Sequence, residues 1–368
     1  MKRILLVGAT HLVGSHILDQ ALSANLRVRA ILESREEAHR IQQLYPSVDS
    51  SVLDFLVVPS GEITRPRVFS DALSDSADPF EAVILCLAAD AYEEVDCLSR
   101  YVAAESERVC RILGSIKDAS TAVGRVILVS SLTRFAGWLA NPSTSGHPRR
   151  YTINMPVPEP EIGGVDSDYI LEASRASDNV IYDAICNWIK DSNTSFEFVA
   201  LSAPAIYGPS IWGVDHWVDI QEANLEIWNI LNKQTSETVP SPPYGIYSYA
   251  DVRDVALATI QALHVPMTRV NRVYLSAGSM PSTLIIAQYL TARFPECEEL
   301  VQSDQLAPQL SACLETAQSP ESEDSNNSGS ILGLGRYRSW EEAVGDVAAQ
   351  LLDFRRRRER TRKMGMGG

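Results

Sequence analysis

The stretch that decides the fold is Val7-Gly8-Ala9-Thr10-His11-Leu12-Val13-Gly14, a glycine-bearing turn that follows an apolar run. That run, Lys2 to Val7, predicts a short buried strand, and Ser15 to Ala24 predicts an amphipathic helix. A second strand is expected over Leu26 to Leu32. A tight turn between a strand and a helix gathers backbone N–H groups and the positive helix end at one point. The stretch therefore predicts a pyrophosphate site and a dinucleotide-binding fold.

One residue of the turn departs from the expected pattern, and one residue beyond it supports the prediction. The pattern is Gly-x-x-Gly-x-x-Gly, and His11 stands at its middle position, where glycine lets the backbone approach a phosphate. Three alternatives follow for the His11 imidazole: it points away from the phosphate site, it contacts a bound phosphate, or it weakens phosphate binding. Glu33 closes the second strand 19 residues after Gly14, where a carboxylate accepts a hydrogen bond from a ribose hydroxyl. Expected cofactor contacts in the turn are Gly8, Thr10, His11, Leu12, Val13 and Gly14.

Composition excludes several classes of protein. The chain has 368 residues, 45% of them hydrophobic, and a formal net charge of −15, which argues against nucleic-acid and anionic-membrane partners. No apolar run is long enough to cross a membrane, and the N-terminus enters the first strand without a secretory leader. The cysteines lack paired spacing, which favours free thiols, no metal site and a cytoplasmic location. They are Cys86, Cys97, Cys110, Cys186, Cys297 and Cys313.

Strand-like and helical patterns alternate over the first two hundred residues. Such alternation predicts an α/β fold, a Rossmann doubly wound parallel sheet with right-handed crossovers. The further strands are expected over Ser51 to Val58, Ala82 to Ala88, Arg125 to Ser131 and Phe196 to Ser202. The longer helices are expected over Val95 to Ala119 and Ala176 to Asp191.

The chain divides into a core, a lobe and a tail. Residues 1–203 are predicted to form the nucleotide-binding core, with an insertion over 138–167, and residues 204–354 mainly a smaller C-terminal substrate lobe. The polar, low-complexity stretch 315–330 predicts a flexible loop, and 355–368 a solvated basic tail. The lobe is expected to contain helices over Val252 to Leu263, Ser282 to Phe294 and Trp340 to Phe354, and a strand over Arg272 to Ser276.

Several segments together resemble the extended short-chain dehydrogenase/reductase superfamily. They are Val7-Gly8-Ala9-Thr10 with Gly14-Ser15-His16-Ile17, Val57-Val58-Pro59 with Glu62-Ile63-Thr64, Arg125 to Ser131, Pro204-Ala205-Ile206-Tyr207-Gly208-Pro209, Asp251-Val252-Arg253-Asp254-Val255-Ala256, and Leu332-Gly333-Leu334 with Trp340-Glu341-Glu342-Ala343. They occur in order over nearly the whole chain. The branch that the chain most resembles contains dihydroflavonol-4-reductase and the NADPH-dependent methylglyoxal and aldehyde reductases.

The resemblance implies hydride transfer between a nicotinamide and a carbonyl carbon. It assigns Ser131 to the serine that holds the carbonyl oxygen, but the Tyr-x-x-x-Lys pair that supplies the proton and binds ribose is missing. Counting back from Pro204 places Arg175 at the tyrosine position and Asn179 at the lysine position. Arg175 can polarise a carbonyl but is a poor proton donor, and Asn179 carries no charge. Tyr169 lies upstream and is the remaining candidate for the proton donor.

The choice of cofactor is open at this stage. The resemblance implies NADP(H), yet Glu33 and Glu37 stand where basic residues clasp a 2′-phosphate, so local charge favours NAD(H). Arg35 and Arg40 lie on the same segment and offer the opposite charge. By resemblance, Glu62 lies near adenine, and the cofactor passes Leu87, Ala88, Pro204 and Ile206.

Three functions compete. The first is an NAD(P)H-dependent ketone or aldehyde reductase for a bulky, polyketide-like substrate, with a rearranged proton relay. An aromatic pocket is expected from Trp212, Trp217, Trp228, Tyr244 and Tyr247, which are otherwise core residues. The second is a scaffold protein that has lost the chemistry, favoured by His11, the Glu33/Glu37 pair and Arg175/Asn179. The third, an isomerase or dehydratase, fits a missing tyrosine less well. Homodimerisation through Val95 to Ala119 and Ala176 to Asp191 is expected by resemblance.

Overall fold

The structure is a computed structural model, and it describes residues 2–75, 78–87, 98–134, 167–220, 222–232, 246–297 and 331–365. Its centre is a seven-stranded sheet in the order β3-β2-β1-β4-β5-β6-β9, in which every neighbouring pair is parallel. The strands are β1 (Arg3–Val7), β2 (Arg27–Leu32), β3 (Leu53–Val57), β4 (Ala82–Leu85), β5 (Arg125–Ser131), β6 (Glu197–Ala203) and β9 (Val270–Tyr274). The predicted Rossmann fold is confirmed.

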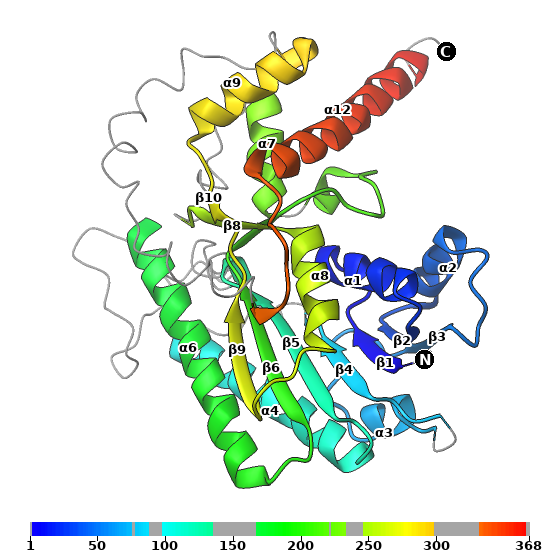
Figure 1. The fold of residues 1–368 in the computed structure, drawn as a ribbon. Helices are drawn as coiled ribbons and strands as arrows, with labels where there is room; N and C mark the ends of the chain where they lie inside the picture. The colour runs from blue at the N-terminus through cyan, green and yellow to red at the C-terminus, as the bar shows by residue number, and fades with distance from the viewer. Residues whose placement is uncertain are drawn as a thin grey trace.

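Helices cover both faces of this sheet (Figure 1). One apolar layer joins the sheet to α1 (Leu12–Ser23), α2 (Arg35–Leu44) and α8 (Val252–Ala262). The other joins it to α3 (Val68–Ala72), α4 (Leu98–Ala119) and α6 (Ser167–Ser192). Strands β1 and β4 are buried along their whole length, as expected for strands that are covered on both faces.

A smaller lobe lies at one end of the sheet. A second sheet has the order β10-β8-β7 and comprises β7 (Ala205–Tyr207), β8 (Ser248–Asp251) and β10 (Gly278–Ser279). Around it gather α7 (Glu222–Leu231), α9 (Thr283–Arg293), α12 (Trp340–Gly365) and the short turns η1 (Trp217–Asp219) and η3 (Pro295–Cys297) (Figure 1). Apolar contacts continue from the α4/α6 layer into this lobe, so the two parts share one core.

The structure corrects two of the predicted boundaries. The segment from Val252 to Tyr274 does not belong to the lobe, because α8 packs on α1 and β9 extends the main sheet beside β6. The helix expected from Ala176 begins at Ser167, at the end of the predicted insertion 138–167. Of that insertion, residues 138–166 lie outside the described part of the chain, as does the predicted loop 315–330.

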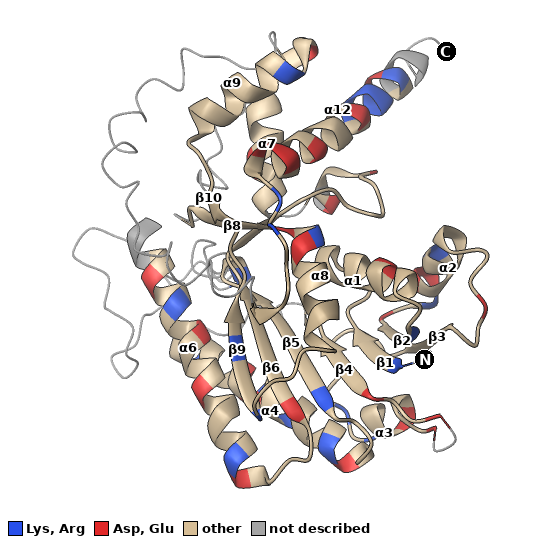
Figure 2. Ribbon diagram, viewed as in Figure 1, with Lys and Arg blue, Asp and Glu red and all other residues tan. Residues whose placement is uncertain are grey.

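The predicted basic tail is also different from the expectation, because α12 continues through Phe354 to Gly365 (Figure 2). Its first arginines are engaged by the lobe. Arg355 donates to the carbonyl of Leu231, and Arg357 donates to the carbonyl of Val214 at 2.9 Å. Arg356 pairs with Glu296. The start of the tail is therefore the last part of a docked helix.

Candidate active site

A cavity of about 420 Å³ opens where the C-terminal ends of β1, β4 and β5 meet the lobe. This edge of a parallel sheet is where open α/β proteins bind their ligands. Its lining comes from the turn after β1, from the ends of β4 and β5, and from β7 and α7 of the lobe. The lining residues are Thr10, His11, Leu12, Val13, Cys86, Leu87, Val129, Ser130, Ser131, Thr133, Arg134, Ile206 and Ala223.

The turn after β1 is built for a close backbone approach. Gly8 has φ +80, and a Cβ there would lie 2.1 Å from the carbonyl oxygen of Cys86. A Cβ on Gly14 would lie 1.9 Å from the carbonyl oxygen of Gly8. Only glycine permits this packing of turn against helix. Helix α1 starts at Leu12, and its N-cap residue, His11, makes no side-chain capping hydrogen bond. The helix end therefore faces the cavity as an anion site that fits a pyrophosphate.

The His11 side chain does not point away from the site. Its Nδ1 lies 3.2 Å from the carbonyl oxygen of Cys86, and the ring lines the cavity. Because a carbonyl oxygen only accepts, this contact places a proton on Nδ1. The thiol of Cys86 stays neutral, since burial raises its pKa to about 12. His11 thus occupies part of the space that a glycine would leave for the phosphates.

The turn between β2 and α2 shows a different use of Glu37 from the one expected. Its carboxylate accepts from the Thr10 hydroxyl at 3.1 Å and from the Glu33 backbone N–H at 2.7 Å. Its own N–H donates to Ser34, the N-cap of α2, at 3.2 Å. Glu37 therefore ties the phosphate turn to the β2–α2 turn, while the Glu33 side chain is exposed beside it.

The two predicted arginines of this segment are turned to the surface. Arg35 is exposed, and the Arg40 guanidinium lies 5.3 Å from the ring centroid of Trp212. Glu62, expected near adenine, pairs with Arg65 at 2.7 Å. These residues do not line the described cavity. Of the two strand-four residues, Leu87 lines the cavity and Ala88 lies outside the described residues.

Ser131 lies at the other end of the cavity, at the end of β5. Its hydroxyl donates to the carbonyl oxygen of Pro204 at 2.7 Å, and the Thr133 hydroxyl lies 2.8 Å away. The Thr133 N–H also donates to Ser131 Oγ at 3.3 Å. Pro204 therefore positions Ser131 and does not line the cavity itself. Ile206, two residues further along the chain, is one of the lining residues. Ser131 and Thr133 present a pair of hydroxyls to a ligand.

The structure places the predicted positions on α6 outside the described cavity lining. Arg175 pairs with Glu172 at 3.4 Å, and the exposed Asn179 accepts from Arg272 at 2.7 Å. Neither lines the cavity. The inward face of α6 carries other residues: Ile170, Ala173, Ser174, Ser177 and Ile181. Each residue of miscounting turns a helical position by about 100°, so a count along the sequence missed this face. Tyr169 lies in the first turn of α6, and its side chain is outside the described part.

Arg134 is a cavity residue that the sequence analysis missed. Its side chain is 10% exposed and pairs with Glu105, whose side chain is fully buried. Glu105 also pairs with the buried Arg108 at 3.2 Å. A signal was present, because Glu105 stands on the apolar face of α4 that includes Tyr101, Val102, Val109 and Ile112. A carboxylate at a core position of a helix predicts a buried cationic partner.

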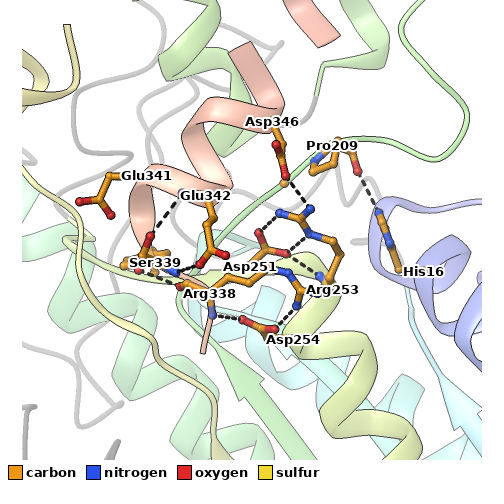
Figure 3. Close-up of polar contacts among 12 residues, drawn as sticks. His16, Pro209, Asp251, Arg253, Asp254, Arg338, Ser339, Glu341, Glu342 and Asp346 are labelled. Atoms are coloured by element: carbon orange, nitrogen blue, oxygen red, sulfur yellow. Dashed lines mark hydrogen bonds and ion pairs between the residues drawn. The ribbon is translucent and has the colours of Figure 1, made fainter. Parts of the chain in front are cut away.

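The Asp251-Val252-Arg253-Asp254 block is structural. Asp251 caps α8 by accepting from the Arg253 N–H at 2.8 Å, and Arg253 bridges it to Asp346 of α12 at 2.6 Å (Figure 3). Arg338 pairs with Asp254, whose pKa is raised because burial outweighs these favourable contacts (Figure 3). The block joins the core helix α8 to the C-terminal part of the chain, away from the cavity lining.

The predicted aromatic pocket is not found among the described residues. Trp212 stacks with Arg40, Trp217 is 63% exposed, and Trp228 packs against Phe354 with ring centroids 5.5 Å apart. Tyr247 is half-buried outside the lining, and Tyr244 lies outside the described part. The described lobe contributes Ile206 and Ala223 to the wall, so it is apolar there but not aromatic.

Two searches of the described residues gave no site of another kind. No group of three or more histidine, cysteine, aspartate or glutamate side chains is arranged to hold a metal ion among them. No helix in the described part is both long and apolar enough to cross a membrane. Cys86, Cys110, Cys186 and Cys297 are free thiols, and Cys97 and Cys313 lie outside the described ranges.

Two relatives found by comparison with known proteins are named as an oxidoreductase and a ketoreductase. No family model matches the chain. An uncharacterized oxidoreductase of Schizosaccharomyces pombe is 25% identical over 302 residues, which is 82% of this chain and 84% of that protein. Ketoreductase azaE of Aspergillus niger is 23% identical over 360 residues, 96% of this chain and 98% of the relative.

Solved structures share the fold over almost the full length. The yeast methylglyoxal/isovaleraldehyde reductase Gre2, complexed with NADPH, gives a TM-score of 0.69 at 19% identity and covers 96% of this chain and 99% of its own. Vestitone reductase from alfalfa gives 0.63 at 15% identity, with 96% and 100% covered. Together with the glycine turn, the parallel sheet and the serine at the end of β5, these matches confirm the resemblance. The chain is similar in sequence to an oxidoreductase and a ketoreductase, and it has the fold of the Gre2 and vestitone reductase structures.

Proposed function

We propose that this protein is an NAD(P)H-dependent reductase of a ketone or aldehyde carried on a fairly bulky, apolar substrate. The observation that carries the proposal is that one cavity joins the N-terminus of α1 to the hydroxyls of Ser131 and Thr133. A phosphate site and a carbonyl site thus share a continuous wall. Relatives named as an oxidoreductase and a ketoreductase, and the NADPH complex of a similar fold, support it.

The residues of the chain divide the work between binding and polarisation. When bound, a reduced nicotinamide supplies the hydride for the carbonyl carbon. The backbone N–H groups at the start of α1 hold the pyrophosphate, and Gly8 and Gly14 keep that backbone accessible. Ser131 is held by Pro204, and the Thr133 hydroxyl beside it is the group that can turn to donate a hydrogen bond to the carbonyl oxygen. The apolar surface of Leu87, Val129 and Ile206 excludes water and accommodates the body of the substrate.

We propose NADPH as the cofactor, with NADH as the alternative that the exposed Glu33 favours. The phosphate-binding arginine would be Arg35, which is exposed on the turn beside Glu33. A bound 2′-phosphate would need that side chain to turn inward, since a carboxylate at Glu33 repels it.

Titration of the protein with each nucleotide, followed by nicotinamide fluorescence, tests this proposal. We expect micromolar binding of at least one and tighter binding to His11→Gly, because that change frees space at the phosphates. Absence of binding in both proteins would refute the reductase and favour the scaffold protein. Binding only after the change would show that His11 closes the site.

We also propose that the chain works in the reducing cytoplasm, because the four described cysteines are free thiols. We further propose that it forms a homodimer through the outer faces of α4 and α6, which pack side by side on one face of the sheet. Sedimentation should give twice the chain mass of 40.5 kDa. A single-chain mass at micromolar concentration would refute the dimer. Imaging of a tagged chain tests the location, and a signal confined to an organelle would refute it.

A further inference from the structure

A chain of polar side chains runs from the wall of the cavity to α6 and β9. Ser130 lines the cavity near the end of β5, and its Oγ lies 3.3 Å from the Oγ of Ser202 on β6. These two residues are register partners in the parallel pair β5–β6, so their side chains lie on the same face of the sheet. Ser202 donates to the Asp178 carboxylate of α6 at 3.2 Å, and Arg272 of β9 pairs with that carboxylate. The chain thus links a cavity residue to a buried ion pair.

The ion pair fixes the direction of these hydrogen bonds. Asp178 is 8% exposed, and its partner Arg272 also lies against two aromatic rings. The guanidinium is 4.8 Å from the ring centroid of Tyr182 and 4.7 Å from that of Tyr274. A carboxylate paired with a guanidinium is ionised and can only accept hydrogen bonds. The single proton of the Ser202 hydroxyl is therefore directed to Asp178.

This direction determines what Ser130 offers to a ligand. Because the proton of Ser202 is committed to Asp178, Ser202 accepts at its contact with Ser130, and Ser130 donates. A serine hydroxyl has one proton and two acceptor lone pairs. The half-buried Ser130 oxygen therefore faces the cavity with lone pairs and without a proton. A ligand group that contacts Ser130 has to bring its own O–H or N–H.

The neighbouring hydroxyl at this end of the cavity has the opposite character. The Thr133 hydroxyl lies 2.8 Å from Ser131 Oγ, and the proton of Ser131 is donated to the carbonyl oxygen of Pro204. The Thr133 hydroxyl can turn away from Ser131 and donate to a carbonyl oxygen instead. The reaction end thus offers a donor from Thr133 and an acceptor from Ser130.

From this geometry we propose that Ser130 is a specificity-determining residue that accepts a hydrogen bond from a hydroxyl group of the substrate. The preferred substrate is then a ketone or aldehyde that carries a hydroxyl near its carbonyl. The inference rests on the proposed reductase function. Ser202 and Asp178 are positioning residues, because they act only by holding the Ser130 proton away from the cavity. A carbonyl compound without the hydroxyl leaves the Ser130 acceptor unpaired, which weakens its binding.

A matched pair of ketones tests the acceptor through turnover with NADPH. The probes α-hydroxyacetophenone and propiophenone have nearly the same shape and differ in a hydroxyl against a methyl group. Their intrinsic reactivities cancel when the ratio of kcat/KM values is compared between proteins. We expect Ser130→Ala to lower the preference for the hydroxy ketone about tenfold, and Ser130→Thr, which keeps the acceptor, to retain most of it. Ser115→Ala, on the exposed face of α4, is the control. An unchanged ratio in Ser130→Ala would overturn the inference.

Ser202→Ala tests the direction of the chain without changing the cavity wall. The change removes the acceptor of the Ser130 proton, so the Ser130 hydroxyl can turn and donate into the cavity. The probe is α-methoxyacetophenone, whose ether oxygen only accepts. We expect its kcat/KM to rise about threefold or more relative to that of the hydroxy ketone, the size of part of one hydrogen bond. An unchanged ratio in Ser202→Ala would overturn the inference.

Binding measurements separate a failure of this inference from a failure of the reductase function. Calorimetric titration of the protein loaded with NADP⁺ gives the affinity for each ketone without turnover. Preferred binding of the hydroxy ketone that is lost in Ser130→Ala, without turnover of any probe, would reject the reductase function and leave the Ser130 site in place. Turnover or binding without a preference in the unchanged protein would overturn the inference alone. A rise of about tenfold in the NADPH dissociation constant of Ser130→Ala would assign the acceptor to the nucleotide and overturn the inference.

Discussion

The two ends of the cavity bind by different means. At the phosphate end, the turn from Gly8 to Gly14 offers backbone N–H groups, and its shape depends on two missing Cβ atoms. At the reaction end, Ser131, Thr133 and Arg134 offer side chains that are held by Pro204 and Glu105 from distant parts of the chain. The first end is therefore fixed by local sequence, whereas the second is fixed by tertiary packing. Changes at the two ends should separate cofactor binding from catalysis.

The largest effect is expected at the phosphate end from Gly14→Ala. Its Cβ would lie 1.9 Å from the carbonyl oxygen of Gly8, so the turn and α1 must move apart. We expect a loss of about 3 kcal/mol in the free energy of unfolding, from overpacking, together with loss of nucleotide binding. Urea unfolding and nucleotide titration measure the two. Gly335→Ala is the matched control, because a Cβ there meets nothing within 4 Å. Normal NADPH affinity in Gly14→Ala would contradict the account of the turn.

The next largest effect is expected at the reaction end from Glu105→Gln. This change removes the buried carboxylate that pairs with Arg108 and Arg134, so the free energy of unfolding should fall by about 3 kcal/mol. Glu107→Gln, two residues away on α4, breaks an exposed pair with Arg111 and should cost under about 0.5 kcal/mol. Chemical denaturation of both variants provides the comparison. Similar losses in the two would show that the buried cluster is not a special feature of this end.

A smaller change in binding is expected from Glu33→Arg. The exposed carboxylate beside the β2–α2 turn is replaced by a cation, and we expect the ratio of NADPH to NADH affinity to rise about tenfold, which corresponds to about 1.4 kcal/mol. Glu36→Arg, an equal charge change in the first turn of α2, should shift the ratio less. Unchanged relative affinities in Glu33→Arg would show that Glu33 does not lie at the ribose.

The smallest effect concerns His16, which anchors α1 to the loop after β7. Its Nε2 N–H donates to the carbonyl oxygen of Pro209 at 2.8 Å (Figure 3), and burial lowers its pKa below 6.5. The unfolded chain then binds a proton that the folded chain does not, so stability decreases as pH falls from 6.5 toward the folded pKa. The slope from one such proton is at most about 1.4 kcal/mol per pH unit.

His16→Gln provides the test, because an amide N–H can still donate to Pro209 but does not titrate. Unfolding free energies measured between pH 5 and pH 7, an interval of about two units, should depend less on pH in this variant. The shifts of His264 and Asp254 are common to both proteins and cancel in the difference. His39→Gln, on the exposed face of α2, is the matched control for the loss of one imidazole. Equal slopes for all three proteins would contradict the buried neutral state of His16.

The contrast between the two ends also explains what the sequence could predict. Gly8, Gly14 and the strands around them were predicted correctly, since a φ of +80 and a strand-turn-helix pattern are local properties. Position Ser131 was found because it ends a strand whose predicted bounds match β5. The role of Ser131 remains a proposal.

Long-range contacts account for what was missed. Glu37 is tied to Thr10, 27 residues before it, and this contact cannot be deduced from the spacing of charges. Glu105 and Arg134 meet only after α4 and β5 pack together. Arg175 and Asn179 lie off the described cavity lining because the rotation of α6 depends on its packing and not on distance from Pro204. Recognition of a carboxylate on the apolar face of α4 would have improved the prediction.

The most direct test of the central claim is transfer of deuterium from nicotinamide to product. NADPH deuterated at C4, prepared as each of the two stereoisomers, is mixed with excess protein and a panel of ketones and aldehydes, including isovaleraldehyde. We predict that one isomer transfers its deuterium to the carbinol carbon of a product in a single turnover, as mass spectrometry would show. Tight binding of NADPH without deuterium transfer from either isomer to any carbonyl would contradict the account and favour a scaffold protein.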